Sequence, residues 1–344
     1  MAGRADTATL TEPQPSGTQT GASINMKAHS PHDGGGRELA VVALGGNALL
    51  RRGEPATASN QLLAARAVAE VLAPVSERTR LVVTHGNGPQ VGLLALKEDA
   101  YDDGDPYPLD VLDAESGGQI GYVVELELDN AIHHQDTVTV ITRVLVDADD
   151  PAFDDPTKFI GPVYDERRAR ALAAEHGWSV KPDGDGWRRV VPSPDPKQII
   201  QLGAIRGLVE TGFLVVCVGG GGVPVIANGN GHAGVEAVID KDLASALLAV
   251  GLGADVLALA TDVDAVYTAW GTRAQRAVAR ATPAWLRAQC FAGGSMGPKV
   301  EAACRFVEAT GARAAIGRLE DLPGLIDGTV GTQLLEGGPE VELH

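Results

Sequence analysis

Short apolar runs alternate along the chain with longer stretches in which apolar residues recur at helical spacing. The runs that predict strands are residues 39–44, 80–83, 137–146, 213–218, 255–261 and 312–316, and the stretches that predict helices are 56–72, 91–100, 113–132 and 243–250. The runs are almost continuously apolar, which is typical of strands buried on both faces. Strands that alternate with helices in this way predict an α/β fold: a three-layer αβα sandwich around a mainly parallel, open sheet.

Two segments depart from this rhythm. Residues 1–36 are rich in Thr, Ser, Gly, Pro and Ala without an apolar period, which predicts a disordered tail. A transit peptide is a weaker interpretation, because Arg4 and Lys27 are the only Arg or Lys there and three acidic residues offset them. Residues 148–196 contain seven prolines and two of the four tryptophans. Within a domain spanning 37–344, we expect this stretch to form an inserted subdomain that protrudes as a lid.

Composition excludes several classes of protein. The chain has 28 Lys and Arg against 45 Asp and Glu, a formal net charge of −17, which argues against a nucleic-acid surface. It contains no apolar run of about 18 residues, so the sequence predicts no membrane span. The three cysteines lie far apart, which disfavours a disulfide framework or a zinc site and favours a reducing cytoplasm.

Three familiar motifs fail a test of context. Residues 229–234 match the dinucleotide pattern G-x-G-x-x-G, but the acidic residue that should close the next strand, Asp255, precedes it instead. Residues 293–297 match the nucleophile elbow G-x-S-x-G, but the preceding residues 285–291 are helical in pattern where a strand is required. The chain has no Gly-Lys dipeptide, which excludes a Walker A loop.

Two glycine-rich turns do stand in the context that an anion-binding turn requires. Gly45-Gly46-Asn47 follows the first predicted strand, Gly86-Asn87-Gly88 follows the second, and each opens a helix. Backbone N–H groups in such turns and at helix N-termini bind anionic oxygens, and the ends of parallel strands meet at one edge of a sheet. The alternative is that they are only tight turns that reverse the chain. A quartet, Gly219–Gly222, follows another strand and indicates either close approach to a ligand or a hinge.

Lysine is scarce, with seven in the chain, and two lysines begin predicted helices. Lys241 stands between Asp240 and Asp242, which indicates either a phosphate-facing lysine held by a carboxylate or a solvated charge cluster. Lys299 follows Pro298 at the start of another helix, where the helix N-terminus already favours an anion. His85 is interpreted as a turn residue and not as a catalytic base.

The ordered set of motifs resembles the carbamate kinases of the amino acid kinase superfamily, from about residue 38 to the end. The motifs are VVALGGNAL, THGNGPQVG, PTKFIGPVY, GWRRVVPSP, GGGGVPV, GVEAVIDKD, TDVDAVY, GSMGPKVEAA and GTVGT. The resemblance implies an eight-stranded, mainly parallel sheet, a protruding subdomain and a homodimer. It implies the reaction ATP + carbamate = ADP + carbamoyl phosphate, with Mg, often serving ATP formation in arginine catabolism.

The resemblance also implies roles for single residues. Carbamate and the transferred phosphoryl group would bind at Gly45, Gly46, Asn47, Gly86, Asn87 and Gly88. The catalytic set would be Lys158, Lys241, Asp242 and Lys299. Lys241 and Lys299 would balance charge on the β- and γ-phosphates, Asp242 would orient those two lysines, and Lys158 would reach in from the protruding subdomain. The nucleotide would bind at Asp262, Val263, Tyr267, Ser295, Met296 and Gly297. No protein ligand of the metal is assigned, and Glu115 near the second turn has no role.

One position favours carbamate over the larger acids that related kinases phosphorylate. Those relatives resemble one another in having a lysine two residues before the first Gly-Gly, where this chain has Ala43. Lys158, on the predicted lid, is a candidate replacement for that cation. Carbamate is already an anion, so the reaction needs positioning and charge compensation and no general base. The alternatives are another small-acid or phosphate kinase of the superfamily and a non-catalytic nucleotide-binding regulator.

Overall fold

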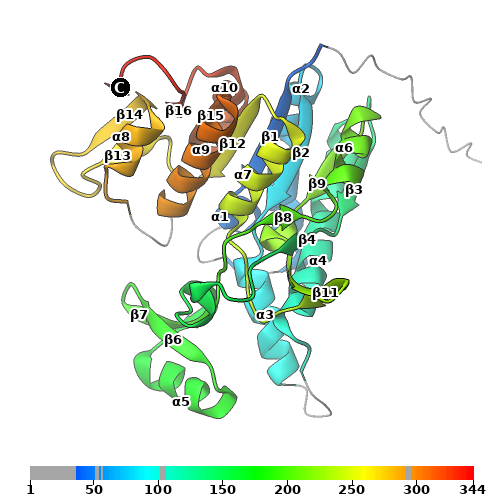
Figure 1. Ribbon diagram of the computed structural model, residues 1–344, viewed down its shortest axis with the longest axis vertical. Coiled ribbons are helices and arrows are strands. Elements are labelled where there is room, and N and C mark those ends of the chain that lie inside the picture. Colours follow the sequence, from blue (N-terminus) through cyan, green and yellow to red (C-terminus); the bar gives the residue numbers. More distant parts are fainter. Residues whose placement is uncertain (1–35, 51–53, 56, 101–105, 292–295) are drawn as a thin grey trace, which may run out of the picture.

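The computed structural model describes residues 36–50, 54–55, 57–100, 106–291 and 296–344, and within them a large sheet forms the centre of the molecule (Figure 1). Its strands are β1 (Leu39–Leu44), β2 (Arg80–His85), β3 (Thr137–Val140), β9 (Leu214–Cys217), β12 (Val256–Thr261), β13 (Val266–Thr268), β14 (Arg276–Ala281), β15 (Arg313–Arg318), β16 (Thr332–Leu334) and β17 (Val341–Leu343). The order is β13-β14-β16-β15-β12-β1-β2-β9-β3, and β17 pairs with β14. The run from β15 to β3 is parallel throughout.

Helices cover both faces of this sheet, which confirms the predicted three-layer sandwich. One face packs against α2 (Ala58–Ser76), α4 (Leu109–Ala131) and α10 (Leu322–Asp327); the other packs against α6 (Leu202–Glu210), α7 (Lys241–Leu252), α8 (Pro283–Arg287) and α9 (Met296–Thr310). Strand β1 shows the cause: Val41 belongs to one apolar core and its neighbour Val42 to the other, both fully buried. Alternate side chains of one strand thus anchor the two helical layers.

The sheet differs from expectation in two respects. It has ten strands among the described residues, where the resemblance implied eight, because the short strands β13, β14, β16 and β17 extend it beyond β15. The strand predicted over residues 137–146 was wrong, since β3 ends at Val140 and β4 (Arg143–Leu145) belongs to another sheet. The Thr142 hydroxyl donates to the Val140 carbonyl at 2.8 Å and accepts from the Val218 N–H at 3.1 Å. This local side-chain bonding breaks the strand.

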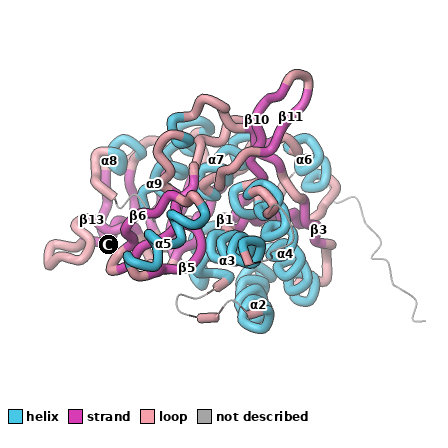
Figure 2. The backbone as a smooth tube through the Cα atoms, turned by 90° about the horizontal axis from the view of Figure 1, so that it is seen from below, coloured by secondary structure: helices cyan, strands magenta, loops and turns pink. Residues whose placement is uncertain are grey.

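The second sheet has four strands in the order β11-β10-β4-β8. Strands β10 (Val223–Asn228) and β11 (Gly231–Gly234) form a hairpin that stands out from the body in Figure 2, and β8 (Gln198–Ile199) completes the sheet. The string Gly229–Gly234 lies in this hairpin, so its match to the dinucleotide pattern comes from a β-turn and a strand.

Residues within 148–196 form a third sheet with a helix of their own, set below the body in Figure 1. The short helix η1 (Pro151–Phe153) leads to β5 (Lys158–Tyr164), α5 (Glu166–His176), β6 (Ser179–Asp183) and β7 (Gly186–Val191). Arginines stack on both tryptophans of the insertion: Arg189 lies 4.5 Å from the ring of Trp178, and Arg170 lies 4.7 Å from Trp187. A unit too small for a large apolar core thus gains packing from cation–π contacts.

Strand β5 ties this unit to α3 (Gly88–Asp99), the helix that opens from the second glycine turn (Figure 2). The contact is between backbones, because a Cβ built on Gly92 would lie 2.0 Å from the nitrogen of Gly161. Elsewhere, α1 (Gly46–Leu49) follows the first turn, and the short helices η2 (Gly219–Gly221) and η3 (Leu319–Asp321) precede β10 and α10. No helix in the described ranges combines the length and apolar character needed to cross a membrane. The predicted tail lies outside those ranges, except for residue 36.

Candidate active site

The two predicted glycine turns lie side by side at the carboxyl edge of the parallel strands. Strands β1 and β2 are neighbours, and the N–H of Gly86 donates to the Leu44 carbonyl at 3.3 Å. A Cβ on Gly86 would meet the Lys241 side chain at 3.3 Å and the nitrogen of Gly46 at 3.9 Å. The turns and the first residue of α7 therefore converge on one point, which is where a parallel sheet presents its ligand crevice.

Lys241, Asp242 and Lys299 form one buried ion-pair cluster. The Nζ of Lys241 donates to Oδ1 of Asp242, and the Nζ of Lys299 donates to Oδ2 of the same carboxylate at 3.2 Å. The side chains of the three residues are 9%, 5% and 12% exposed. One carboxylate thus orients two ammonium groups that come from the N-termini of α7 and α9.

Burial and these neighbours move the two lysine pKa values in opposite directions. Burial lowers the pKa of Lys241 from its ordinary 10.5 and Lys299 adds to the fall, while Asp242 and Asp240 oppose it. Burial also disfavours the charged form of Lys299, but Asp242 and Asp240 outweigh this, so the pKa of Lys299 is raised. The site therefore holds one ammonium that stays charged and one that loses its proton more readily.

Lys158, on β5, pairs with Asp240, the residue before this cluster begins. Its Nζ donates to Oδ2 of Asp240 at 2.6 Å, with side-chain exposures of 30% and 13%. Position 43, where related kinases were expected to have a lysine, is a fully buried alanine in the core. The structure thus brings the lysine of the inserted unit beside the residue that precedes Lys241.

The side chain of Asn87 faces α4 and is held there. Its Nδ2 donates to Oδ1 of Asp113 and to Oγ of Ser116, both at 2.8 Å. Asp113 is 1% exposed, and burial, together with Asp110 and Glu236, raises its pKa well above 3.8, against the effect of Asn87. Both amide hydrogens of Asn87 are therefore used within the protein, so this residue can offer an anion its backbone N–H but no side-chain donor.

His85 ends β2 with a neutral ring. Burial lowers its pKa to about 4, and Nδ1 lies 3.2 Å from the Gly86 carbonyl oxygen. A Cβ on Gly219 would lie 2.7 Å from the ring. These contacts agree with a turn residue that packs against the neighbouring loop.

The glycine quartet approaches protein atoms. Gly220, Gly221 and Gly222 have φ values of 73°, 100° and 86°, a region that favours glycine. Cβ atoms on Gly220 and Gly221 would meet Nδ2 of Asn87 at 2.3 Å and the Ile239 carbonyl oxygen at 2.4 Å. The quartet therefore lets the turn after β9 pack tightly against the Asn87 side chain and against the Ile239 carbonyl, two residues before Lys241. This packing accounts for the glycines without a ligand or a hinge.

The residues predicted to bind the nucleotide lie in the turn after β12, the strand that pairs with β1, and at the start of α9. Asp262 is exposed and Val263 half-buried after β12, and the hydroxyl of Tyr267 donates to Asp264 at 2.9 Å. Met296 packs against the larger core, Gly297 lies beside it, and Ser295 falls outside the described residues. Gly45 joins this region to the first turn, because its Cβ would lie 3.0 Å from the Ala260 carbonyl oxygen.

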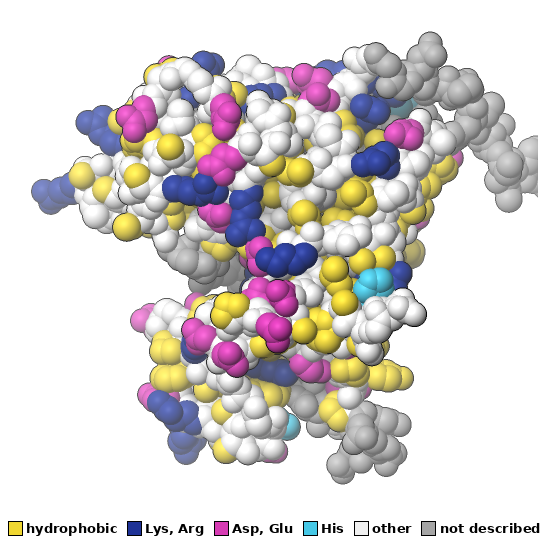
Figure 3. All heavy atoms as spheres, viewed as in Figure 1, with side chains coloured by type: hydrophobic (Ala, Val, Ile, Leu, Met, Phe, Trp, Pro, Cys, Tyr) yellow, Lys and Arg dark blue, Asp and Glu magenta, His cyan; other side chains and the backbone are white. Residues whose placement is uncertain are grey.

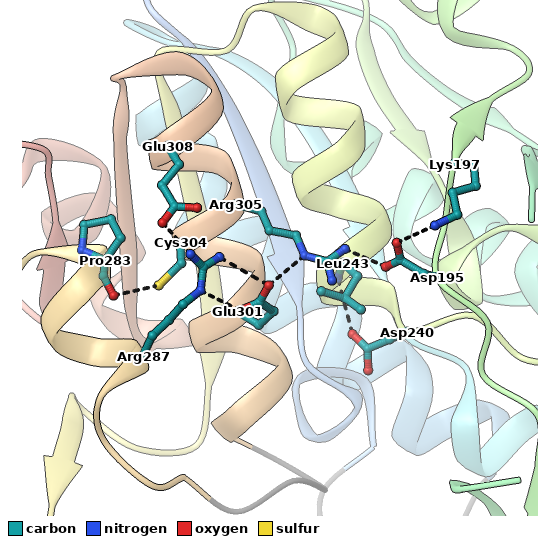
Figure 4. A network of polar contacts seen from close by, with 10 residues as sticks. All are labelled: Asp195, Lys197, Asp240, Leu243, Pro283, Arg287, Glu301, Cys304, Arg305 and Glu308. Carbon is teal, nitrogen blue, oxygen red and sulfur yellow. Dashed lines mark hydrogen bonds and ion pairs between the residues drawn. The ribbon is translucent and has the colours of Figure 1, made fainter. Parts of the chain in front are cut away.

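A surface network links α9 to the base of the inserted unit (Figure 4). Arg305 on α9 pairs with Asp195 at 2.5 Å and with Glu301 at 2.8 Å. The N–H of Asp195 donates at 2.9 Å to Asp150, which lies at the other root of the insertion. Figure 3 shows a hollow between the insertion and the part of the body that carries α8 and α9.

Sequence reasoning missed three polar residues of the site: Asp113, Ser116 and Asp240. Asp113 and Ser116 lie on the buried face of α4 together with Leu112 and Ile120, so polar residues in the apolar stripe of a predicted helix were the available signal. Asp240 was visible only as part of a charge cluster. Glu115, which had no assigned role, is exposed between these buried positions.

Known proteins match the chain over nearly all of its described length. The model of the "Amino acid kinase family" matches residues 38–318. The carbamate kinase of Rhizobium meliloti is 50% identical over 308 residues, covering 88% of this chain and 95% of the relative. That of Pyrococcus horikoshii is 45% identical, covering 86% and 99%. The solved structure of Giardia lamblia carbamate kinase bound to AMP-PNP has a TM-score of 0.80 at 37% identity, covering 87% and 98%.

These matches agree with the class that the fold and site define, an α/β phosphotransferase with paired glycine turns. The chain belongs to the amino acid kinase family and, within it, to the carbamate kinases.

Proposed function

We propose that the protein catalyses the reversible transfer of a phosphoryl group between ATP and carbamate, giving ADP and carbamoyl phosphate. The observation that carries this proposal is the convergence of two glycine turns with Lys158, Lys241 and Lys299 at one edge of the sheet. The names and high identities of the relatives support it.

Charge compensation explains what these residues do. Carbamate and the terminal phosphate are both anions, and their approach in a partly dry site costs several kcal/mol unless cations balance it. The three ammonium groups and the backbone N–H groups of the turns would supply that balance. The carbamate oxygen attacks phosphorus in line, so catalysis rests on position and electrostatics.

Lys241 and Lys299 would balance the charge of the γ-phosphate, which is transferred, and of the β-phosphate, which stays on ADP. Both issue from helix N-termini, and both are oriented by Asp242 before any ligand arrives. A preorganised charge at a transferring phosphoryl group is worth about 10²–10⁴-fold in rate. The nucleotide would extend from these lysines along the turn at Asp262 and Val263 and past Tyr267 toward Met296 and Gly297.

The structure suits a magnesium ion that arrives with the nucleotide. Among the described residues, no three His, Cys, Asp or Glu side chains gather where they could hold a metal. Mg²⁺ commonly binds through substrate phosphates, its own waters and one or two carboxylates. The exposed Asp262 carboxylate, in the turn after β12 where the phosphates are proposed to bind, would contact it.

We also propose the setting in which the reaction runs. The insertion at 148–196 acts as the lid that presents Lys158, and the enzyme works as a cytoplasmic homodimer, as the resemblance to its family implies. ATP formation during arginine breakdown is the physiological direction that this family resemblance favours.

The test is ATP formation by the purified protein from ADP and carbamoyl phosphate, with Mg²⁺. A panel of other acyl phosphates and pyrophosphate, each offered as the phosphoryl donor to ADP at the same concentration, separates carbamate from other acceptors. The proposal expects carbamoyl phosphate to be preferred by at least about 100-fold in kcat/KM. Binding of ATP without turnover of any substrate would favour a nucleotide-binding regulator instead.

A further inference from the structure

Asp240 has two contacts that use its two oxygens separately. Its Oδ1 accepts the N–H groups of Asp242 at 2.9 Å and Leu243 at 3.3 Å, which caps the N-terminus of α7 (Figure 4). Its Oδ2 accepts from Lys158 Nζ at 2.6 Å. One carboxylate therefore joins the helix that carries Lys241 to the strand that carries Lys158.

The contacts around Asp240 already bring the insertion against the body. Just before Asp240, the N–H of Val238 donates to the Pro192 carbonyl at 2.9 Å, where the chain returns from the insertion. Three residues beyond Lys158, β5 rests on α3 through Gly92 and Gly161. The ion pair thus adds a side-chain contact to two backbone contacts between the insertion and the body, and it fixes the long Lys158 side chain.

We propose that Asp240 is a positioning residue for the phosphoryl transfer: it holds the ammonium group of Lys158 beside the N-terminus of α7 before carbamoyl phosphate binds. This inference rests on the proposed function. A lysine side chain left free would have to be ordered when the substrate arrives, which costs side-chain conformational entropy.

Asp240 also balances charge among the three lysines. With Asp242 it gives two carboxylates against three ammonium groups, and it raises the pKa of both Lys241 and Lys299. The burial of Asp240 favours its neutral acid, but Lys158 and Lys241 outweigh this, so the pKa of Asp240 lies well below 3.8 and the carboxylate stays charged. Removing its charge would leave three cations facing one carboxylate.

Two substitutions distinguish the role of Asp240 as the N-cap of α7 from the role of its negative charge. Asp240→Asn keeps an oxygen that can cap α7 and removes the ion pair. Asp165→Asn is the matched control, because Asp165 caps α5 through the N–H of Arg168 at 2.9 Å. We expect Asp240→Asn to lower kcat/KM for carbamoyl phosphate about fivefold, mainly through KM, and Asp165→Asn to stay within twofold of the parent.

A double-mutant cycle shows whether the effect passes through the lysine. In a Lys158→Ala background, Asp240→Asn should change kcat/KM less than twofold. An equal loss in both backgrounds would mean that Asp240 only caps the helix, and parental kinetics for Asp240→Asn would also overturn the proposal.

Hydrogen exchange in the protein without substrate gives a readout that does not depend on activity. Amides of β5, residues 158–164, should exchange faster in both Asp240→Asn and Lys158→Ala, and at the parental rate in Asp165→Asn. Unchanged exchange in all three variants would overturn the positioning role. An absence of ATP formation by the parent protein would instead refute the proposed function, and the exchange result would still stand.

Discussion

Asp240 and Asp242 flank Lys241 and have different partners, although they stand two residues apart. Asp242 bridges Lys241 and Lys299, whereas Asp240 caps α7 and pairs with Lys158. The sequence predicted that the three lysines act together, because each stood in a motif of the family. It could not divide the lysines between the two carboxylates, since that depends on how strands far apart in sequence meet.

We expect Lys241 to make activity depend on pH on the alkaline side. Its pKa is lowered from 10.5, so its proton is lost at a lower pH than from an ordinary lysine. The pH profile of kcat/KM, which reports groups of the free enzyme, should therefore fall with an apparent pKa below 10.5.

Asp242→Asn tests the cause of this alkaline fall. The Asp242 carboxylate raises the pKa of Lys241, so its removal should move the alkaline fall to still lower pH. Initial rates measured across the pH range in parent and variant give the comparison. A midpoint that stays in place, or moves upward, would show that another group controls the alkaline limb.

At the scale of elements, the pattern of apolar residues predicted where buried strands lie, but it did not predict where local hydrogen bonds interrupt them. Strand β1 has the predicted bounds because its six residues are apolar and alternate between two cores. The break after Val140 depends on one hydroxyl, that of Thr142, and β-branched residues gave no sign of it. The close approach of β5 to α3 could not be predicted either. Glycine is common in turns, and a contact between two glycines, Gly92 and Gly161, is recognised only when both positions are known in space.

The Gly92–Gly161 contact should control where Lys158 lies. A methyl group at Gly92 would overlap the backbone of Gly161, so Gly92→Ala should push β5 from α3 and lower kcat/KM for carbamoyl phosphate by about tenfold or more. Nucleotide affinity should change little, since the overlap lies where α3 meets β5 and not at the residues proposed to bind the nucleotide. Steady-state kinetics and a nucleotide titration measure both.

Gly207→Ala in α6 is the control for that substitution. Gly207 lies inside a helix, and no atom lies within 4 Å of the position that an added methyl group would take. Alanine should therefore leave the kinetics unchanged and stabilise the protein by up to about 1 kcal/mol. Equal activity of Gly92→Ala and Gly207→Ala would show that the backbone contact does not position the lid lysine.

At the scale of the whole molecule, the alternation of strands and helices was enough to predict the layers. The insertion and the extra strands at the C-terminal end have their own sheet pairings, which follow from long-range contacts that a single sequence does not display. The sequence predicted the edge at which the two glycine turns meet, because neighbouring parallel strands end at the same edge of a sheet. The Asn87–Asp113 contact, between a turn and a helix 26 residues later, was beyond that reasoning.

Removal of residues 1–36 should leave activity and the melting temperature nearly unchanged. The sequence of this segment has no apolar period from which a docking face is expected, and the family match begins at residue 38. Thermal melts and the ATP-forming assay on the shortened and full chains give the comparison. A fall of many degrees in melting temperature would show that the segment packs on the folded domain.

We propose that Lys158 supplies the cation that is missing at position 43, where the chain has alanine, and the Lys158→Ala substitution tests this role. We expect kcat/KM for carbamoyl phosphate to fall about 100-fold or more, in the range of cationic groups supplied to a transferring phosphoryl group, while ADP affinity stays near that of the parent. Lys158→Arg should recover only part of the loss, because a planar guanidinium does not replace a compact ammonium. Near-parental kcat/KM in Lys158→Ala would contradict the account.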